Sequence, residues 1–208
     1  MEGTGEDWGV DRPSERLGRT PTSESFTEAL ILEVEELREL AEAHFGVLDP
    51  TALSWSPGTG RWGVGACIDH LVRTNALYHP LLRAGVERLE EKGPSPNVRV
   101  RGGAFGRWFA TMSGPQPRIR LKAPASFRPA ADSPPSGDSL QVFMEQQDRL
   151  IDLLGRARGL PLDRFRLRSP VSPLIRFRLT DAFRLTVGHE WRHLRQARNV
   201  MHHPGFPR

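Results

Sequence analysis

Apolar residues recur three and four positions apart along four stretches of this chain, as they do on one face of an α-helix. The stretches are residues 25–46, 64–91, 139–157 and 180–203. An amphipathic helix has to bury its apolar face, and the chain of 208 residues is long enough for four such helices to pack together. The sequence therefore predicts an all-α four-helix bundle, as a single domain over residues 23–203.

The remaining segments lack this helical repeat. We expect residues 1–22 to form a disordered N-terminal tail. Residues 92–138 contain eight prolines and six glycines, which predicts a long irregular insertion between the second and third helices, with a short helix only at 104–112. Residues 164–179 alternate apolar and basic side chains on either side of Ser-Pro-Val-Ser-Pro, which favours a short hairpin before the fourth helix.

Three local signals refine the helix boundaries. Residues 25–28 have the Ser-x-x-Glu spacing of a capping box, which predicts the start of the first helix. Thr180 resembles an N-cap for the fourth helix. Pro80 lies within the second helical stretch, so we expect a kink or an interruption there.

Composition narrows the class of protein. The single cysteine, Cys67, excludes a disulfide framework within the chain, and residues 1–22 lack the basic and apolar regions of a signal peptide. No apolar run approaches the roughly 20 residues that span a bilayer. The net charge is +4, but the arginines are scattered among 25 acidic residues, which does not favour nucleic-acid binding. We therefore expect a cytoplasmic protein with no membrane partner.

The fourth helical stretch contains His-Glu-Trp-Arg-His at residues 189–193, which has the H-E-x-x-H pattern of zinc peptidases. Histidines four positions apart project from the same face of a helix, so His189 and His193 can converge on one metal ion. The alternative is that each histidine is an ordinary core residue bonded to a backbone carbonyl. A peptidase also needs a third ligand downstream, but Gln196 and Asn199 occupy the expected positions and no acidic residue follows Glu190. A peptidase is therefore disfavoured.

A third ligand can come from the second helical stretch. His70 lies in Ile-Asp-His-Leu-Val, with apolar residues along its own face, so its side chain should also enter the bundle. One histidine from the second helix and two from the fourth would place three nitrogens on one side of a divalent ion. Such an ion keeps positions open for water or substrate.

The chain resembles the DinB-like proteins in several motifs. They are WSPGTGRWGV before the second helix, ACIDHLVRTNALY within it, HEWRHLRQ on the last helix, and FGRWFA and LKAPASFRP in the insertion. The resemblance implies an up-down-down-up four-helix bundle, often dimeric, with a metal-binding triad of His70, His189 and His193. The superfamily includes metal-dependent transferases that join low-molecular-weight thiols, such as bacillithiol or mycothiol, to their substrates.

Several further residues are candidates for the site. Glu190 is a candidate catalytic proton acceptor, with a surface ion pair to Arg192 or Arg195 as the alternative. Gln196 and Tyr78 are candidates for binding a cofactor or substrate. Cys67 is more typical of a small buried apolar group than of a metal ligand.

Arg107, Arg118 and Arg120 of the insertion are candidates for binding an anionic thiol cofactor. The leading hypothesis is a divalent-metal-binding protein, with Zn, Ni, Mn or Fe, that acts on a small-molecule substrate as a thiol-dependent transferase or hydrolase and forms a homodimer. The alternative is a non-catalytic binding or stress-associated dimer whose site is empty or structural.

Overall fold

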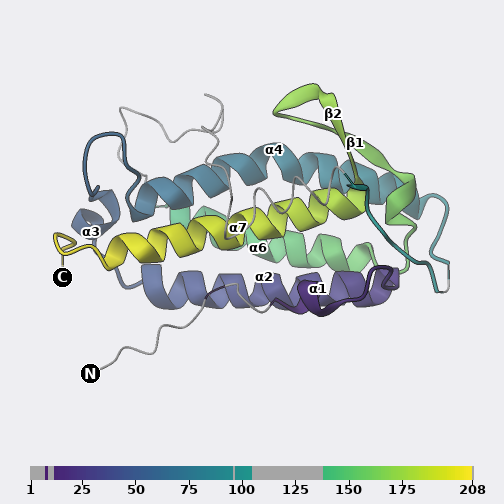
Figure 1. Cartoon of the computed structure of the whole chain (residues 1–208), viewed down its shortest axis with the longest axis horizontal. Coiled ribbons are helices and arrows are strands. Elements are labelled where there is room, and N and C mark those ends of the chain that lie inside the picture. Colours follow the sequence, from purple (N-terminus) through teal and green to yellow (C-terminus); the bar gives the residue numbers. More distant parts are fainter. Residues whose placement is uncertain (1–7, 9–11, 96, 105–137, 208) are drawn as a thin grey trace.

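The computed structural model describes residue 8 and residues 12–95, 97–104 and 138–207 (Figure 1). Its elements, in chain order, are α1 (Pro13–Arg16), α2 (Ser23–Phe45), α3 (Pro50–Ser54), α4 (Val64–Glu90), α6 (Ser139–Arg156), the 3-10 helix η2 (Leu162–Arg164), β1 (Arg166–Ser169), β2 (Ser172–Arg178) and α7 (Leu179–Met201).

Four long helices, α2, α4, α6 and α7, form the bundle (Figure 1). The side chain of Arg156 at the end of α6 binds Glu90 at the end of α4, so these two helices run in the same direction. Ser23 at the start of α2 donates a hydrogen bond to the Leu160 carbonyl just after α6, so α2 runs the opposite way. α7 runs alongside α2 in the direction of α2 (Figure 1). The predicted all-helical bundle is confirmed.

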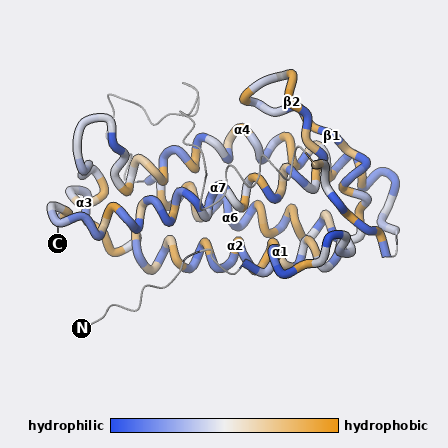
Figure 2. The backbone as a smooth tube through the Cα atoms, in the orientation of Figure 1, coloured by the Kyte–Doolittle hydropathy of each residue, from blue (hydrophilic) through white to orange (hydrophobic). Residues whose placement is uncertain are grey.

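The core is built from the apolar faces of these helices. Figure 2 shows apolar and polar residues alternating along each of them, as the sequence pattern predicted. The largest side chains with almost no exposed surface are those of Trp191, Phe26, Phe45, Phe143, Phe177 and Phe183. Side chains of this size dominate the apolar area that folding removes from water.

Two helix starts differ from the sequence prediction. α2 begins at Ser23, and the Thr22 side chain caps it by accepting a hydrogen bond from the backbone N–H of Ser25 at 3.1 Å. The prediction of a capping box at residues 25–28 is therefore wrong. α7 begins at Leu179, and the Thr180 hydroxyl donates to the Asp163 carboxylate at 2.7 Å instead of capping its own helix. The cap of α2 is thus local, whereas Thr180 at the start of α7 bonds to a residue outside its helix.

Pro80 does not interrupt α4, which continues from Val64 to Glu90. Proline removes one backbone hydrogen bond, the one to the carbonyl four residues earlier. Pro80 and Ala76 both lie on the exposed side of the helix, so water can satisfy the Ala76 carbonyl. The expected interruption is therefore wrong, because the missing bond faces solvent.

Part of the segment expected to be a disordered tail packs on the bundle. Trp8 is only 4% exposed and contacts the rings of His44 and Phe45 edge-on. Residues 12–22 include the short helix α1 and lead into α2. The expectation of disorder is thus wrong for these residues, whereas residues 1–7 and 9–11 lie outside the described part of the chain.

The predicted hairpin is confirmed. β1 and β2 pair antiparallel, with Leu167 opposite Phe177 on the buried face. The hairpin connects η2 to α7 and projects from one end of the bundle (Figure 1).

Most of the insertion between α4 and α6, including nearly all of the helix expected at 104–112, lies outside the described residues. Within the described ranges, no helix is long and apolar enough to cross a bilayer.

A buried carboxyl joins the N-terminal segment to the bundle. Glu33 on α2 is fully buried, and its two oxygens accept hydrogen bonds from the Ser14 backbone N–H at 2.8 Å and from the Trp191 indole at 3.2 Å. The Arg12 guanidinium lies 3.7 Å away. Burial raises the pKa of Glu33, and these partners offset only part of the rise. The folded protein therefore holds the Glu33 proton more tightly than the unfolded chain does.

Because the folded-state pKa of Glu33 is above its ordinary value of 4.5, the stability that Glu33 contributes is complete below that pH and is lost as pH rises through the folded pKa. Glu33→Gln cannot titrate. We predict that the free energy of unfolding of the wild type, minus that of Glu33→Gln, decreases as the pH rises above 4.5, as measured by urea denaturation. A difference that is constant with pH would contradict the prediction.

Candidate metal centre

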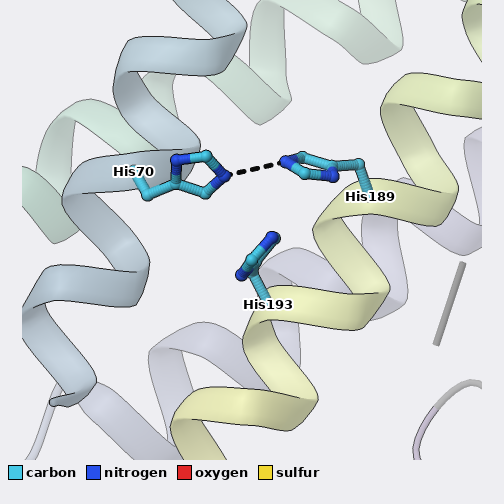
Figure 3. Close-up of side chains that lie close together, drawn as sticks. All are labelled: His70, His189 and His193. Atoms are coloured by element: carbon cyan, nitrogen blue, oxygen red, sulfur yellow. Dashed lines mark hydrogen bonds between the residues drawn. The ribbon is translucent and has the colours of Figure 1, made fainter. Parts of the chain in front are cut away.

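Three histidines from two helices meet inside the bundle. The ring nitrogens that could bind a metal come from His70 on α4 and from His189 and His193 on α7. One nitrogen of each ring lies within 4.8 Å of the other two. The Nε2 atoms of His70 and His189 are 2.9 Å apart. Figure 3 shows these two rings facing each other, with the His193 ring pointing into the same space. The structure therefore brings together the three histidines that the sequence singled out.

The local chain geometry accounts for this meeting. His189 and His193 are four residues apart on α7, so both face the neighbouring α4. The start of α4 depends on Gly63, where a Cβ would lie only 1.8 Å from the Trp55 carbonyl oxygen. A larger residue at position 63 would push the loop off α4 and displace its first two turns, which carry His70.

His189 and His193 are held in their neutral form. His70 and His193 are 2% and 5% exposed, and His189 is partly buried. Burial lowers the pKa of both His189 and His193 well below the ordinary value, and neighbouring imidazoles and the Arg192 charge lower it further. Neutral imidazole is the form that binds metals, because one ring nitrogen then has a free electron pair.

The nitrogen positions suit a divalent ion. Two nitrogens that are each about 2.0 to 2.1 Å from one ion lie roughly 2.8 to 3.4 Å apart for bond angles between a right angle and a tetrahedral angle. The 2.9 Å separation of the His70 and His189 nitrogens is within this range. It is also the length of an N–H···N hydrogen bond, which these two rings can form without an ion. The donor set and the spacing of the His70 and His189 nitrogens therefore fit a metal.

Trp62 covers this site, a role that sequence reasoning missed. Its ring centroid lies 4.8 Å from that of His70 and 5.7 Å from that of His193. In the sequence, Trp62 was part of the WSPGTGRWGV motif and was not a candidate for the site. The signal that could have indicated the role is position, since Trp62 comes just before the helix that carries His70.

Gln196 and Tyr78, the two candidates for cofactor or substrate binding, have different surroundings. The Gln196 side chain lies one turn beyond His193 and is close enough to raise the pKa of that imidazole, against the lowering effect of burial. The Tyr78 hydroxyl is buried and lies 3.3 Å from the Ser169 hydroxyl of β1. The structure thus joins Gln196 to the histidine group and Tyr78 to the hairpin.

Glu190 is not part of the histidine group. Its side chain is fully buried, and its Oε1 accepts hydrogen bonds from Asn75 at 2.7 Å and from Gln147 at 3.1 Å. Burial raises the pKa of Glu190 to about 7, against the lowering effect of the two hydrogen bonds. The alternative expectation, a surface ion pair of Glu190 with Arg192 or Arg195, is therefore wrong. The buried carboxyl is also poorly placed to accept a proton from a ligand.

The other candidates lie away from the histidines or outside the described residues. Cys67 is fully buried, and burial raises the pKa of its thiol well above the ordinary value, as expected for a structural cysteine. The described residues hold one group of three or more histidine, cysteine or acidic side chains that could bind a metal, and Cys67 is not in it. Arg107, Arg118 and Arg120 lie in the part of the insertion that is not described.

Comparison with known proteins identifies a family for this chain. No curated protein and no solved structure matched this chain. The family model described as the DinB superfamily matches residues 33–197, a span that begins within α2, ends within α7 and includes all three histidines. The chain belongs to the DinB superfamily.

Proposed function

We propose that this protein binds a divalent metal ion through His70, His189 and His193 and uses it to act on a small molecule, as a thiol-dependent transferase or a hydrolase. The observation that carries the proposal is the convergence of three imidazole nitrogens within 4.8 Å of one another. Zn, Ni, Mn and Fe all accept imidazole ligands, so the donor set does not select among them.

Each part of the site has a role in this proposal. A bound ion would act as a Lewis acid that lowers the pKa of water or of a thiol at its remaining positions. Imidazole binds a metal ion as a neutral ligand, so three imidazoles would leave the charge of the ion undiminished. Trp62 covers the rings of His70 and His193.

The positive charge of Arg192 favours an anionic thiol or an anionic substrate at this site. It lies between His189 and His193 in the sequence of α7, and its positive charge is close enough to lower the pKa of both. A cation beside a metal centre attracts an anion to it. Low-molecular-weight thiol cofactors and carboxylate substrates both meet this requirement.

Two other functions, a zinc peptidase and a non-catalytic dimer, have less support. In a zinc peptidase the glutamate of H-E-x-x-H activates water at the metal, whereas Glu190 is buried against Asn75 and Gln147. A non-catalytic dimer would need only an empty or structural histidine site. The homodimer that the family resemblance implies can be tested by light scattering, where the mass of one chain would contradict it.

Metal content tests the site directly. Protein purified without chelators, or reconstituted with Zn²⁺ or Ni²⁺, should contain about one equivalent of metal by elemental mass spectrometry. His70→Ala, His189→Ala and His193→Ala should each lose it, because two imidazoles hold an ion much more weakly than three. His202→Ala is the matched control, since His202 is exposed at the end of α7.

If His70→Ala retained a full equivalent, the three-histidine site would be wrong. An absence of metal from the reconstituted wild type would favour the non-catalytic alternative.

Activity can be tested with an aryl chloride and a low-molecular-weight thiol. In thiol transfer the sulfur forms a bond to the aryl carbon, chloride leaves and the thiol proton passes to the buffer. We predict that the metal-loaded wild type accelerates this reaction, or the hydrolysis of an activated ester without thiol, and that His70→Ala does neither. Equal rates for the wild type and His70→Ala in both assays would contradict an enzymatic role.

A further inference from the structure

Three polar side chains, one from each of three helices, meet in the bundle interior next to the histidines. They are Asn75 of α4, Gln147 of α6 and Glu190 of α7, and each is at most 1% exposed. One atom joins them, because Glu190 Oε1 accepts a hydrogen bond from both amides. We propose that this polar cluster positions the metal ligands by fixing the register of α4 against α7, an inference that rests on the proposed metal site.

The cluster lies close to the ligands on both helices. Glu190 follows His189 directly in the chain. Asn75 is five residues after His70, which corresponds to about 7.5 Å along the axis of α4. A hydrogen bond between Asn75 and Glu190 therefore restrains the two helices near the point where their histidines meet.

A metal site needs such a restraint because its ligands come from different helices. A slide of one helix past the other by one residue moves a side chain by about 1.5 Å. Metal–ligand distances tolerate a change of only about 0.2 Å. Apolar packing between α4 and α7 has no preferred direction, whereas the 2.7 Å bond between Asn75 and Glu190 fixes one relative position.

Stability alone does not explain the cluster. Burying a carboxyl group with two amides costs solvation, and apolar side chains of similar size would fill the same space at little or no loss of stability. The Glu190 side chain also has no exposed surface, and its Oε2 has no hydrogen-bond partner among the described residues. Its hydrogen bonds are thus better explained by the geometry they impose on His70 and His189 than by stability or by contact with a substrate.

Two variants separate positioning from folding. Glu190→Gln keeps an Oε1 acceptor for both amides, so it should retain the register. The triple variant Asn75→Leu/Gln147→Leu/Glu190→Leu removes every polar partner together and leaves none of them unpaired, so it should fold with nearly wild-type stability. Gln146→Leu is the matched control, because it removes a buried hydrogen bond between α6 and the Val72 carbonyl of α4 without involving α7.

The affinity for Zn²⁺, measured by competition with a chromophoric chelator, should fall about 10- to 100-fold in the triple variant. It should stay at the wild-type value in Glu190→Gln and Gln146→Leu. Urea denaturation of the metal-free proteins shows whether each variant is folded. Wild-type affinity in a folded triple variant would overturn the positioning role and leave the metal site intact. Loss of affinity in Glu190→Gln with its stability unchanged would also overturn it.

If the triple variant did not fold, Asn75→Ala would replace it, because this change removes the hydrogen bond of the cluster that joins α4 to α7. The affinity of Asn75→Ala for Zn²⁺ should fall more than that of Gln146→Leu, and an equal fall in the two variants would show a general effect of core substitution and would contradict the inference. Failure of the wild type to bind Zn²⁺ would instead overturn the metal site, and the positioning role with it.

Discussion

The contact between α4 and α7 determines what this protein can do, because the candidate ligands are divided between these two helices. His70 comes from one, and His189 and His193 come from the other. Neither helix could hold a three-ligand site alone. The rest of the bundle maintains this contact: α2 and α6 complete the core, and the Trp62 ring packs over the imidazoles at the end where α4 begins.

Much of this arrangement could be predicted from the sequence, because helical spacing determines which side chains share a face. The four apolar repeats predicted the four long helices, and the spacing of His189 and His193 predicted that both would point to one place. His70 could be chosen as their partner because its own apolar face had to enter the same core. Such predictions use only the period of the helix and the need to bury apolar surface.

Other features could not be predicted, because they depend on contacts between distant segments. The H-E-x-x-H pattern suggested a catalytic Glu190, but Asn75 and Gln147, 115 and 43 positions away, determine its surroundings. Near the start of α7, the Asp163 carboxylate accepts a hydrogen bond from the Thr180 hydroxyl, so Thr180 does not cap the helix. Trp8 gave no periodic signal, and its burial follows from its contacts with the end of α2.

The central claim is that three imidazoles, and no other side chain, hold one divalent ion between α4 and α7. X-ray absorption spectroscopy of the zinc-loaded protein tests it most directly, because the spectrum reports the number and type of ligand atoms. The account predicts three imidazole nitrogens at about 2.0 to 2.1 Å, with the remaining coordination from solvent oxygen. A sulfur ligand at about 2.3 Å, or fewer than three imidazoles, would contradict it.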